Sequence, residues 1–198
     1  PIENYDFTLL DFKKIILDSD FVVVDLNCSL QTIKNLLDIL GDSTKNKLFI
    51  SAVSEIKSLK LLEIVPFSAK GIFLNCMEFE FLKKKTQKDI LHLIDTTWFI
   101  TYQNGVVIKN NSYESFVLNN FCYSKKSSFS GCGDTFMAGC IFNIFHENQS
   151  FKEAAYNSFV ILEPVICNKG AQITDTTKIT SDLVYRDSLT GLYQRAFL

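Results

Sequence analysis

The chain has 198 residues, of which 47% are hydrophobic and 21% are charged, and its formal net charge is −2. This composition is typical of a globular domain with a sizeable core, and it excludes disordered, collagen-like and strongly charged chains. A charge this close to neutral disfavours nucleic acids and anionic membranes as partners. No apolar run reaches the roughly 18–20 residues that a transmembrane helix requires. We therefore expect no nucleic-acid partner and no membrane partner.

Six cysteines are scattered through the sequence, without a Cys-x-x-Cys pair and with only two histidines beside them. A zinc site would need a closer grouping of these residue types. Three disulfides are possible by number, but most of the cysteines lie in apolar stretches, as buried thiols do. The pattern favours reduced, mostly buried cysteines and a cytoplasmic location. The cysteines are Cys28, Cys76, Cys122, Cys132, Cys140 and Cys167.

The first half of the chain alternates between helical and strand patterns. A β-branched run predicts a strand over 21–26 that is buried on both faces, as in a parallel sheet. The helix that follows is expected to begin after Ser29, a good N-cap, and to stop at Gly41. The other elements predicted here are helices over 9–17 and 57–65 and a strand over 48–53.

The second half continues the alternation. Asn104-Gly105 is a hairpin signal between two strands, and Pro164 is expected to end the last helix early. The predicted strands cover 71–74, 98–102 and 106–108, and the predicted helices cover 77–84, 89–94, 134–145 and 151–162. Strands that alternate with helices indicate an α/β protein built on a mainly parallel sheet.

A glycine-rich segment, 130–139, carries the clearest chemical signal. Gly131 and Gly133 allow the backbone to approach a ligand, so that successive N–H groups point at one anion next to the start of a helix. Asp134 is badly placed for binding phosphate alone but well placed to take a proton from a hydroxyl. Together these residues suit phosphoryl transfer. The same residues also suit a glycine-rich helix start with an Asp cap.

This segment resembles the Gly-Ala-Gly-Asp signature of the ribokinase-like (PfkB) carbohydrate kinases, with Cys132 in the Ala position. The resemblance implies a ribokinase-like layered α/β/α sandwich with a mainly parallel sheet. It also implies that Asp134 is the catalytic base and that Gly131, Cys132 and Gly133 form the anion hole for the ATP phosphates.

Further motifs follow in the order of that family. Asn75-x-x-Glu78 is similar to the Asn-x-x-Glu motif that positions magnesium and phosphates, which implies Mg²⁺ and ATP as cofactors. Thr101 and Gly105 match parts of the nucleotide loop. Asn168 and Gly170 resemble the segment that borders the adenine pocket.

Two other motifs resemble the pseudouridine-kinase branch. Asp25-x-Asn27 looks like a motif that ends an earlier strand, and Val53-Ser54-x-x-Lys57 follows the next predicted strand. They make Asn27 and Lys57 candidates for contact with the substrate or with a phosphate. An isolated lysine at such a position would be a surface residue.

The resemblance covers residues 1–175 and begins in the middle of the family's domain. It implies a kinase domain truncated at the N-terminus, without the lid and most of the sugar-recognition residues. A parallel sheet without its first strands would expose an apolar edge, which favours a homodimer. The remaining residues, 176–198, contain the run 187–192, Asp-Ser-Leu-Thr-Gly-Leu, which resembles the start of a GGDEF-type diguanylate cyclase domain.

Two classes of function follow from these resemblances. The first is an ATP-dependent phosphotransferase that acts on a hydroxyl of a sugar or nucleoside, most like pseudouridine kinase, and that is incomplete as this chain. The second is a degenerate kinase-like sensory or regulatory module coupled to a C-terminal diguanylate cyclase domain. An intact acceptor site upstream would favour the enzyme.

Overall fold

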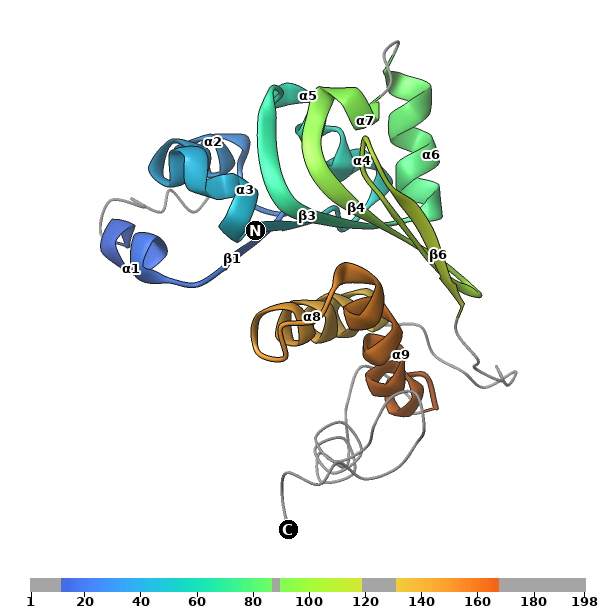
Figure 1. Ribbon diagram of the computed structural model, residues 1–198. Helices are drawn as coiled ribbons and strands as arrows, with labels where there is room; N and C mark the ends of the chain where they lie inside the picture. Colours follow the sequence, from blue (N-terminus) through green and yellow to red (C-terminus); the bar gives the residue numbers. More distant parts are fainter. Residues whose placement is uncertain (1–11, 87–89, 119–130, 168–198) are drawn as a thin grey trace. The chain divides into compact units, whose positions relative to one another are not determined.

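A computed structural model of the chain describes residues 12–86, 90–118 and 131–167. The chain divides into two units, Pro1–Phe116 and Val117–Leu198. The described part of the first unit holds helices α1 to α7 and most of the sheet, and that of the second holds helices α8 and α9 (Figure 1).

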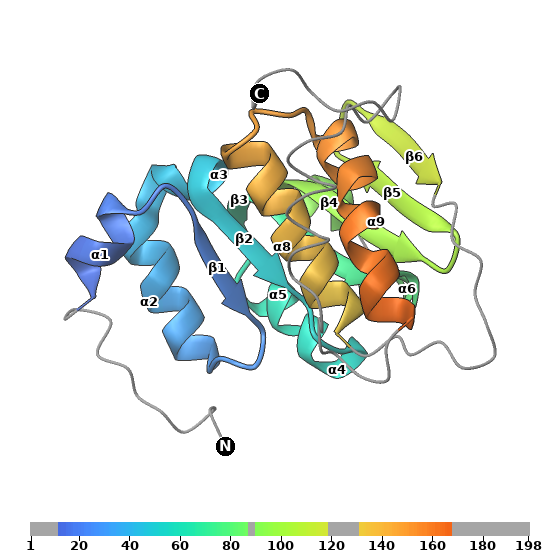
Figure 2. The same ribbon diagram turned by 90° about the horizontal axis from the view of Figure 1, so that it is seen from below.

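The described residues form a sheet of six strands in the order of the sequence, β1 to β6 (Figure 2). β1, β2, β3 and β4 are parallel to one another, and β5 is antiparallel to β4. The mainly parallel sheet predicted from the alternation of elements is therefore confirmed. The strands are β1 Val22–Asp25, β2 Leu48–Ser51, β3 Phe67–Asn75, β4 Ile94–Tyr102, β5 Gly105–Lys109 and β6 Glu114–Leu118.

Some of the helices begin or end at residues that cap them. Ser29 accepts a hydrogen bond from the Thr32 N–H at 3.0 Å before α2, and Gly41 ends that helix at φ 50°, as predicted. The helices are α1 Lys13–Asp18, α2 Leu30–Leu40, the 3₁₀ helix η2 Gly41–Ser43, α3 Thr44–Lys47, α4 Glu55–Ser58, α5 Lys60–Glu63, α6 Cys76–Lys85, α7 Ile90–Leu93, α8 Cys132–Phe145 and α9 Phe151–Cys167. None of the described helices is long and apolar enough to cross a membrane.

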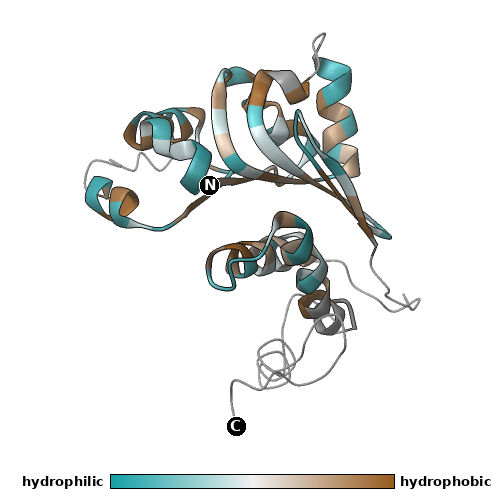
Figure 3. Ribbon diagram, in the orientation of Figure 1, coloured by the Kyte–Doolittle hydropathy of each residue, from teal (hydrophilic) through white to brown (hydrophobic). Residues whose placement is uncertain are grey.

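One face of the sheet forms the main core of the first unit. Alternate residues of the central strands are buried there against side chains of α2, α5 and α6, and the strands are coloured mainly as hydrophobic in Figure 3. On the opposite face, the Phe73 and Phe99 rings stack with centroids 4.4 Å apart. A Cβ at Gly71 would lie 2.9 Å from the Phe49 ring, so this strand position requires a glycine. The core positions that face the helices include Val24, Ile50, Ile72, Leu74, Trp98 and Ile100.

Several predicted helices have different bounds in the structure. Residues 57–65 do not form one helix, because the segment is split into α4 and α5, of four residues each. The helix predicted over 9–17 begins at Lys13 in its described part, and residues 1–11 lie outside the described residues. The prediction that Pro164 ends the last helix was wrong, since α9 continues to Cys167. A proline this close to a helix end removes one hydrogen bond of the last turns.

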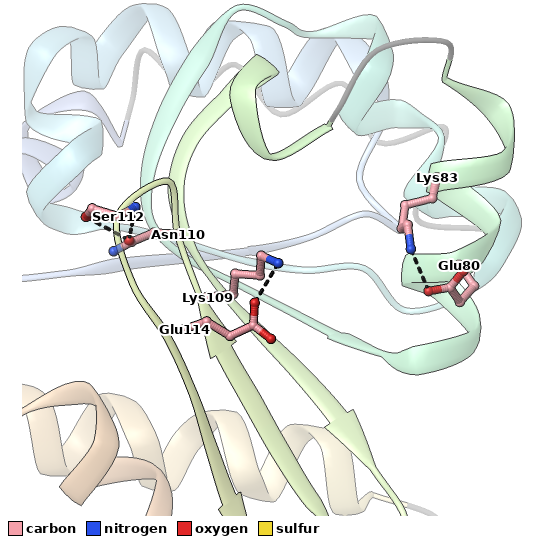
Figure 4. Close-up of polar contacts among 6 residues, drawn as sticks. All are labelled: Glu80, Lys83, Lys109, Asn110, Ser112 and Glu114. Carbon is pink, nitrogen blue, oxygen red and sulfur yellow. Dashed lines mark hydrogen bonds and ion pairs between the residues drawn. The ribbon is translucent and has the colours of Figure 1, made fainter.

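The strand β6 was not predicted from the sequence. It follows β5 through a turn in which Asn110 Oδ1 accepts hydrogen bonds from the N–H and the hydroxyl of Ser112 (Figure 4). Lys109 and Glu114 form an ion pair of 2.6 Å across this turn. In the first hairpin, Tyr102 pairs with Gly105, so Gln103 and Asn104 form the turn and Gly105 begins β5.

The cysteines are less buried than predicted. Among the four described free cysteines, Cys140 is buried, whereas Cys28, Cys76 and Cys132 are half-buried. The three half-buried thiols lie at the starts of helices or in the turn that follows β1, which are less enclosed than the interior of a helix pair.

Candidate functional site

The predicted motifs of the first unit lie at one edge of the sheet, where parallel strands end. β1 ends at Asp25, β2 at Ser51 and β3 at Asn75, and Asn75 is the register partner of Thr101 near the end of β4. Open α/β sheets bind ligands at the carboxyl ends of their strands. The fold therefore brings the predicted residues of this unit to the edge where a ligand is expected.

Asn75 and Glu78 form a capping box at the start of α6. The Asn75 Oδ1 accepts the Glu78 N–H at 2.9 Å, and the Glu78 Oε2 accepts the Asn75 N–H at 2.8 Å. Glu78 is only 5% exposed. Burial raises the pKa of its carboxyl, the hydrogen bond from the Asn75 backbone partly counteracts this rise, and Glu55 adds to it. The buried carboxylate is therefore held in one orientation.

The turn after β1 contacts α4 and α5. The Lys57 ammonium donates a hydrogen bond to the Asn27 Oδ1. The Lys60 ammonium donates to two carbonyls of the same turn, Leu26 O at 2.9 Å and Cys28 O at 2.7 Å. The structure thus joins the two motifs that the sequence analysis had placed on separate elements.

Thr101 and Gly105 lie at the same end of the sheet. The Thr101 hydroxyl donates to the Leu74 carbonyl of the neighbouring strand at 3.3 Å. Gly105 is buried and opens β5, next to the two-residue turn. These residues are close to Asn75 along the strand ends.

In the second unit, the glycine-rich segment forms the start of α8. Gly131 is the N-cap and has a left-handed backbone with φ 79°, which favours glycine. The helix begins at Cys132, two residues before the predicted start, so Asp134 lies inside the first turn and is not the cap. The first N–H groups of a helix have no partner within it, and they carry the positive end of its dipole.

Asp134 is exposed, and within the described residues its carboxylate has no hydrogen-bond or ion-pair partner. A Cβ at Gly133 would meet no atom within 4 Å, so internal packing does not require this glycine. Burial raises the pKa of the Cys132 thiol, which makes a reactive thiolate there unfavourable. The arrangement offers a free carboxylate beside several amide donors, which suits an anion and a nearby hydroxyl.

Close packing of α8 against α9 fixes the direction of this helix. A Cβ at Gly139 would lie 2.9 Å from the Ser158 hydroxyl and from a methyl of Ile161. The Phe136 and Phe159 rings lie 5.2 Å apart. Burial raises the pKa of the Cys140 thiol to about 12, so this cysteine belongs to the interior of the helix pair.

A few predicted positions remain without structural information. Asn168, Gly170 and the run 187–192 lie outside the described residues. Within the described residues, no group of three or more His, Cys, Asp or Glu side chains is arranged to hold a metal ion. Magnesium keeps several waters and needs only one or two carboxylates from the protein. Glu78, with one oxygen outside the capping box, fits such a contact through water.

Lys60 was missed in the sequence, and Val53 was noted there only as the first residue of the motif that contains Lys57. Lys60 contacts a turn 34 residues earlier in the chain, and its only sequence signal is its place one helical turn after Lys57. Val53, between β2 and α4, has a positive φ of 66°. A valine does not predict a positive φ, because this conformation is unfavourable for β-branched residues.

No protein-family model matches the sequence, and no curated protein matches it significantly. Solved structures do match. A carbohydrate kinase from Agrobacterium tumefaciens has a TM-score of 0.64 at 18% identity, over 89% of this chain and 58% of that one. Adenosine kinase from Sinorhizobium meliloti has a TM-score of 0.68 at 13% identity, over 85% and 55%. Ribokinase from Cryptococcus neoformans in complex with ADP has a TM-score of 0.65 at 14% identity, over 79% and 57%.

The chain has the ribokinase-like α/β fold. The structures that share it are sugar and nucleoside kinases of low sequence identity, and the chain spans between 55% and 58% of the lengths of these three. The predicted fold class is confirmed by this similarity. The pseudouridine-kinase branch and the GGDEF tail remain predictions.

Proposed function

We propose that the protein transfers the terminal phosphoryl group of ATP to a hydroxyl of a sugar or nucleoside, with pseudouridine as the favoured acceptor. The observation that carries the proposal is the start of α8, where a left-handed glycine precedes the free amides and an exposed, unpartnered Asp134 lies in the first turn. The kinase fold and the ADP complex of the ribokinase neighbour support ATP as the donor.

The chemistry follows from these groups. The amides of 131–133 would hold the γ-phosphoryl group and stabilise the charge that develops on it during transfer. Asp134 would take the proton of the acceptor hydroxyl as that oxygen attacks phosphorus. An anion hole and a base on one short segment have a fixed mutual geometry, which lowers the cost of positioning them.

The residues at the sheet edge would bind the nucleotide. Asn75 and Glu78 would act through Mg²⁺ and its waters, and Thr101 and Gly105 would line the nucleotide. Magnesium supplies charge neutralisation on the transferring phosphates when bound. Asn168 and Gly170 would contribute to the adenine pocket.

The test is Asp134→Asn in the complete gene product, assayed by acceptor-dependent ADP release. Loss of the base should lower turnover by about 10²- to 10⁴-fold, while ATP affinity stays within about twofold. Glu147→Gln, a change at an exposed acid beyond the end of α8, is the matched control and should keep full turnover. Unchanged turnover in Asp134→Asn would exclude Asp134 as the base.

A further inference from the structure

Lys57 is a positive charge with a neutral partner at the ligand-binding edge of the sheet. Its ammonium is half-buried, and within the described residues it contacts the Asn27 side-chain oxygen and forms no ion pair. The carboxylate in the same turn, Asp25, accepts the Asn27 N–H at 2.7 Å. An ammonium group has three donors. Lys57 therefore keeps both its charge and two donors available to a ligand.

The turn that carries Asn27 is fixed by hydrogen bonds from a residue distant in the sequence. Lys60 donates to the carbonyls of Leu26 and Cys28, which flank Asn27 on both sides. These two bonds fix the backbone that carries the Asn27 side chain. Lys60 therefore determines where the partner of Lys57 lies.

The backbone that leads into α4 is strained. The Ser54 N–H donates to the Ala52 carbonyl at 2.8 Å around Val53 at φ 66°, which describes a classic γ-turn. This turn is rare, and its conformation is unfavourable for a β-branched residue. Val53 is 43% exposed, so burial of its side chain does not compensate for the strain. The turn directs α4 so that Lys57 reaches Asn27.

We propose that Lys57 binds a phosphoryl oxygen of the ligand and that Asn27 and Lys60 are its positioning residues. This inference rests on the proposed function for the identity of the ligand, which is a phosphate dianion or the terminal phosphate of a nucleoside triphosphate. A fixed ammonium without a carboxylate partner attracts an anion more strongly than one that is already paired. The turn at Val53 and the Lys60 hydrogen bonds hold Lys57 beside Asn27. Because Asn27 is neutral, the charge of Lys57 remains available to that anion.

The experiment measures ligand affinity of the 198-residue chain by calorimetry. Two pairs of probes are used, each with one phosphate-bearing and one uncharged member. The first pair is the β,γ-imido analogue of ATP and adenosine, and the second is ribose 5-phosphate and ribose. Lys57→Gln should weaken binding of a phosphate-bearing probe by about 10- to 100-fold and leave its uncharged counterpart unchanged. Lys57→Arg should restore much of the affinity. The difference in affinity between Lys57→Gln and the wild type should become smaller in high salt. Lys34→Gln, at an exposed position on α2, is the matched control.

The two probe pairs distinguish the sources of the phosphate. A deficit with the ATP analogue assigns Lys57 to the nucleotide, and a deficit with ribose 5-phosphate assigns it to a phosphorylated acceptor. Equal binding by Lys57→Gln and the wild type in both pairs would overturn the inference while leaving the proposed kinase activity intact. Failure of the wild type to bind any phosphate-bearing probe would overturn both.

The positioning role has its own test. Asn27→Asp has nearly the same shape as asparagine and keeps the contact with Lys57, but it pairs the ammonium with a carboxylate. It should therefore weaken phosphate binding at least as much as Asn27→Ala, with little loss of stability. If Asn27 had only a structural role, Asn27→Asp would weaken phosphate binding less than Asn27→Ala does. Lys60→Gln should lower phosphate affinity by about 3- to 10-fold and spare the adenosine affinity.

Discussion

At the scale of single residues, Glu78 is both part of a helix cap and a candidate functional group. Its carboxylate closes the capping box of α6 with Asn75, yet it is almost fully buried, and burial raises its pKa. A buried charge that is only partly compensated lowers stability. A nearby cation would offset this cost, which agrees with the proposed contact to hydrated magnesium.

The pH dependence of stability should reveal this charge. The native state holds the Glu78 proton more tightly than the unfolded chain does, because its pKa is raised. Between the two pKa values the native state therefore binds more protons, and the free energy of unfolding should fall as the pH rises through that window. Glu78→Gln keeps an oxygen that can accept the Asn75 N–H but removes the charge. It should raise stability near neutral pH and flatten this part of the profile.

The measurement is urea unfolding of both proteins at several pH values from about 4 to 7. Glu63→Gln, at an exposed acid on α5, serves as the control and should leave the profile in place. A profile that is the same in Glu78→Gln as in the wild type would show that another group causes the pH dependence.

At the scale of elements, the helices depend on their first turns. Ser150 and Glu153 form a reciprocal cap at the start of α9. The Glu153 carboxylate accepts the Ser150 hydroxyl at 2.6 Å and its N–H at 3.0 Å, and the Ser150 oxygen accepts the Glu153 N–H at 3.3 Å. These bonds lower the pKa of Glu153. The same Ser-x-x-Glu spacing in the sequence marks a helix start.

Ser150→Ala should therefore destabilise α9 and change the titration of Glu153. The loss of a cap costs about 1 kcal/mol of stability, seen as an earlier loss of helix signal in urea. The pKa of Glu153 should rise toward its ordinary value, as measured by NMR titration. Ser150→Asn retains an acceptor for the helix N–H and should cost less stability. An unshifted Glu153 in Ser150→Ala would show that the Ser150 hydroxyl does not lower its pKa.

At the scale of the whole molecule, the chain covers less than two thirds of the solved kinases it resembles. Phosphoryl transfer needs the acceptor hydroxyl in line with the phosphate, and such positioning accounts for several kcal/mol of the barrier. The described residues supply candidate groups for the nucleotide, for the anion and for the base. They supply no corresponding set for the acceptor beyond Asn27 and Lys57.

We therefore expect the 198-residue chain to bind ATP without phosphorylating an acceptor. The measurement compares ATP affinity with ADP release in the presence of pseudouridine, ribose or fructose phosphate. Acceptor-dependent ADP release by the chain at a rate typical of kinases, about 1–100 s⁻¹, would contradict this expectation. Acceptor recognition would then lie within residues 1–175.

Much of the fold and of the site could be predicted from the sequence. The β-branched run at 21–26, the cap at Ser29 and the stop at Gly41 depend on residues that are neighbours in the chain, and the bounds of β1 and α2 follow them closely. The prediction that this strand is buried on both faces was wrong, since Val24 is buried and Val23 is 42% exposed. Asn75 and Glu78 form their capping box because a spacing of three residues brings N-cap and N3 together in any helix. Local sterics and local hydrogen bonds are sufficient for these features.

Tertiary structure decided the rest. The helix predicted over 57–65 is divided into α4 and α5, and the strained turn at Val53 fixes the direction of the first, against the preference of its own side chain. The contact of Lys57 with Asn27 joins residues 30 apart, and burial of Glu78 depends on elements that pack around it. The sequence alone indicated candidate residues for phosphoryl chemistry, because such candidates are chosen by residue type and local spacing. Long-range contacts decide which of these residues lie at the same edge of the sheet, which form hydrogen bonds with one another and which charges are buried. These contacts form only when the strands are side by side.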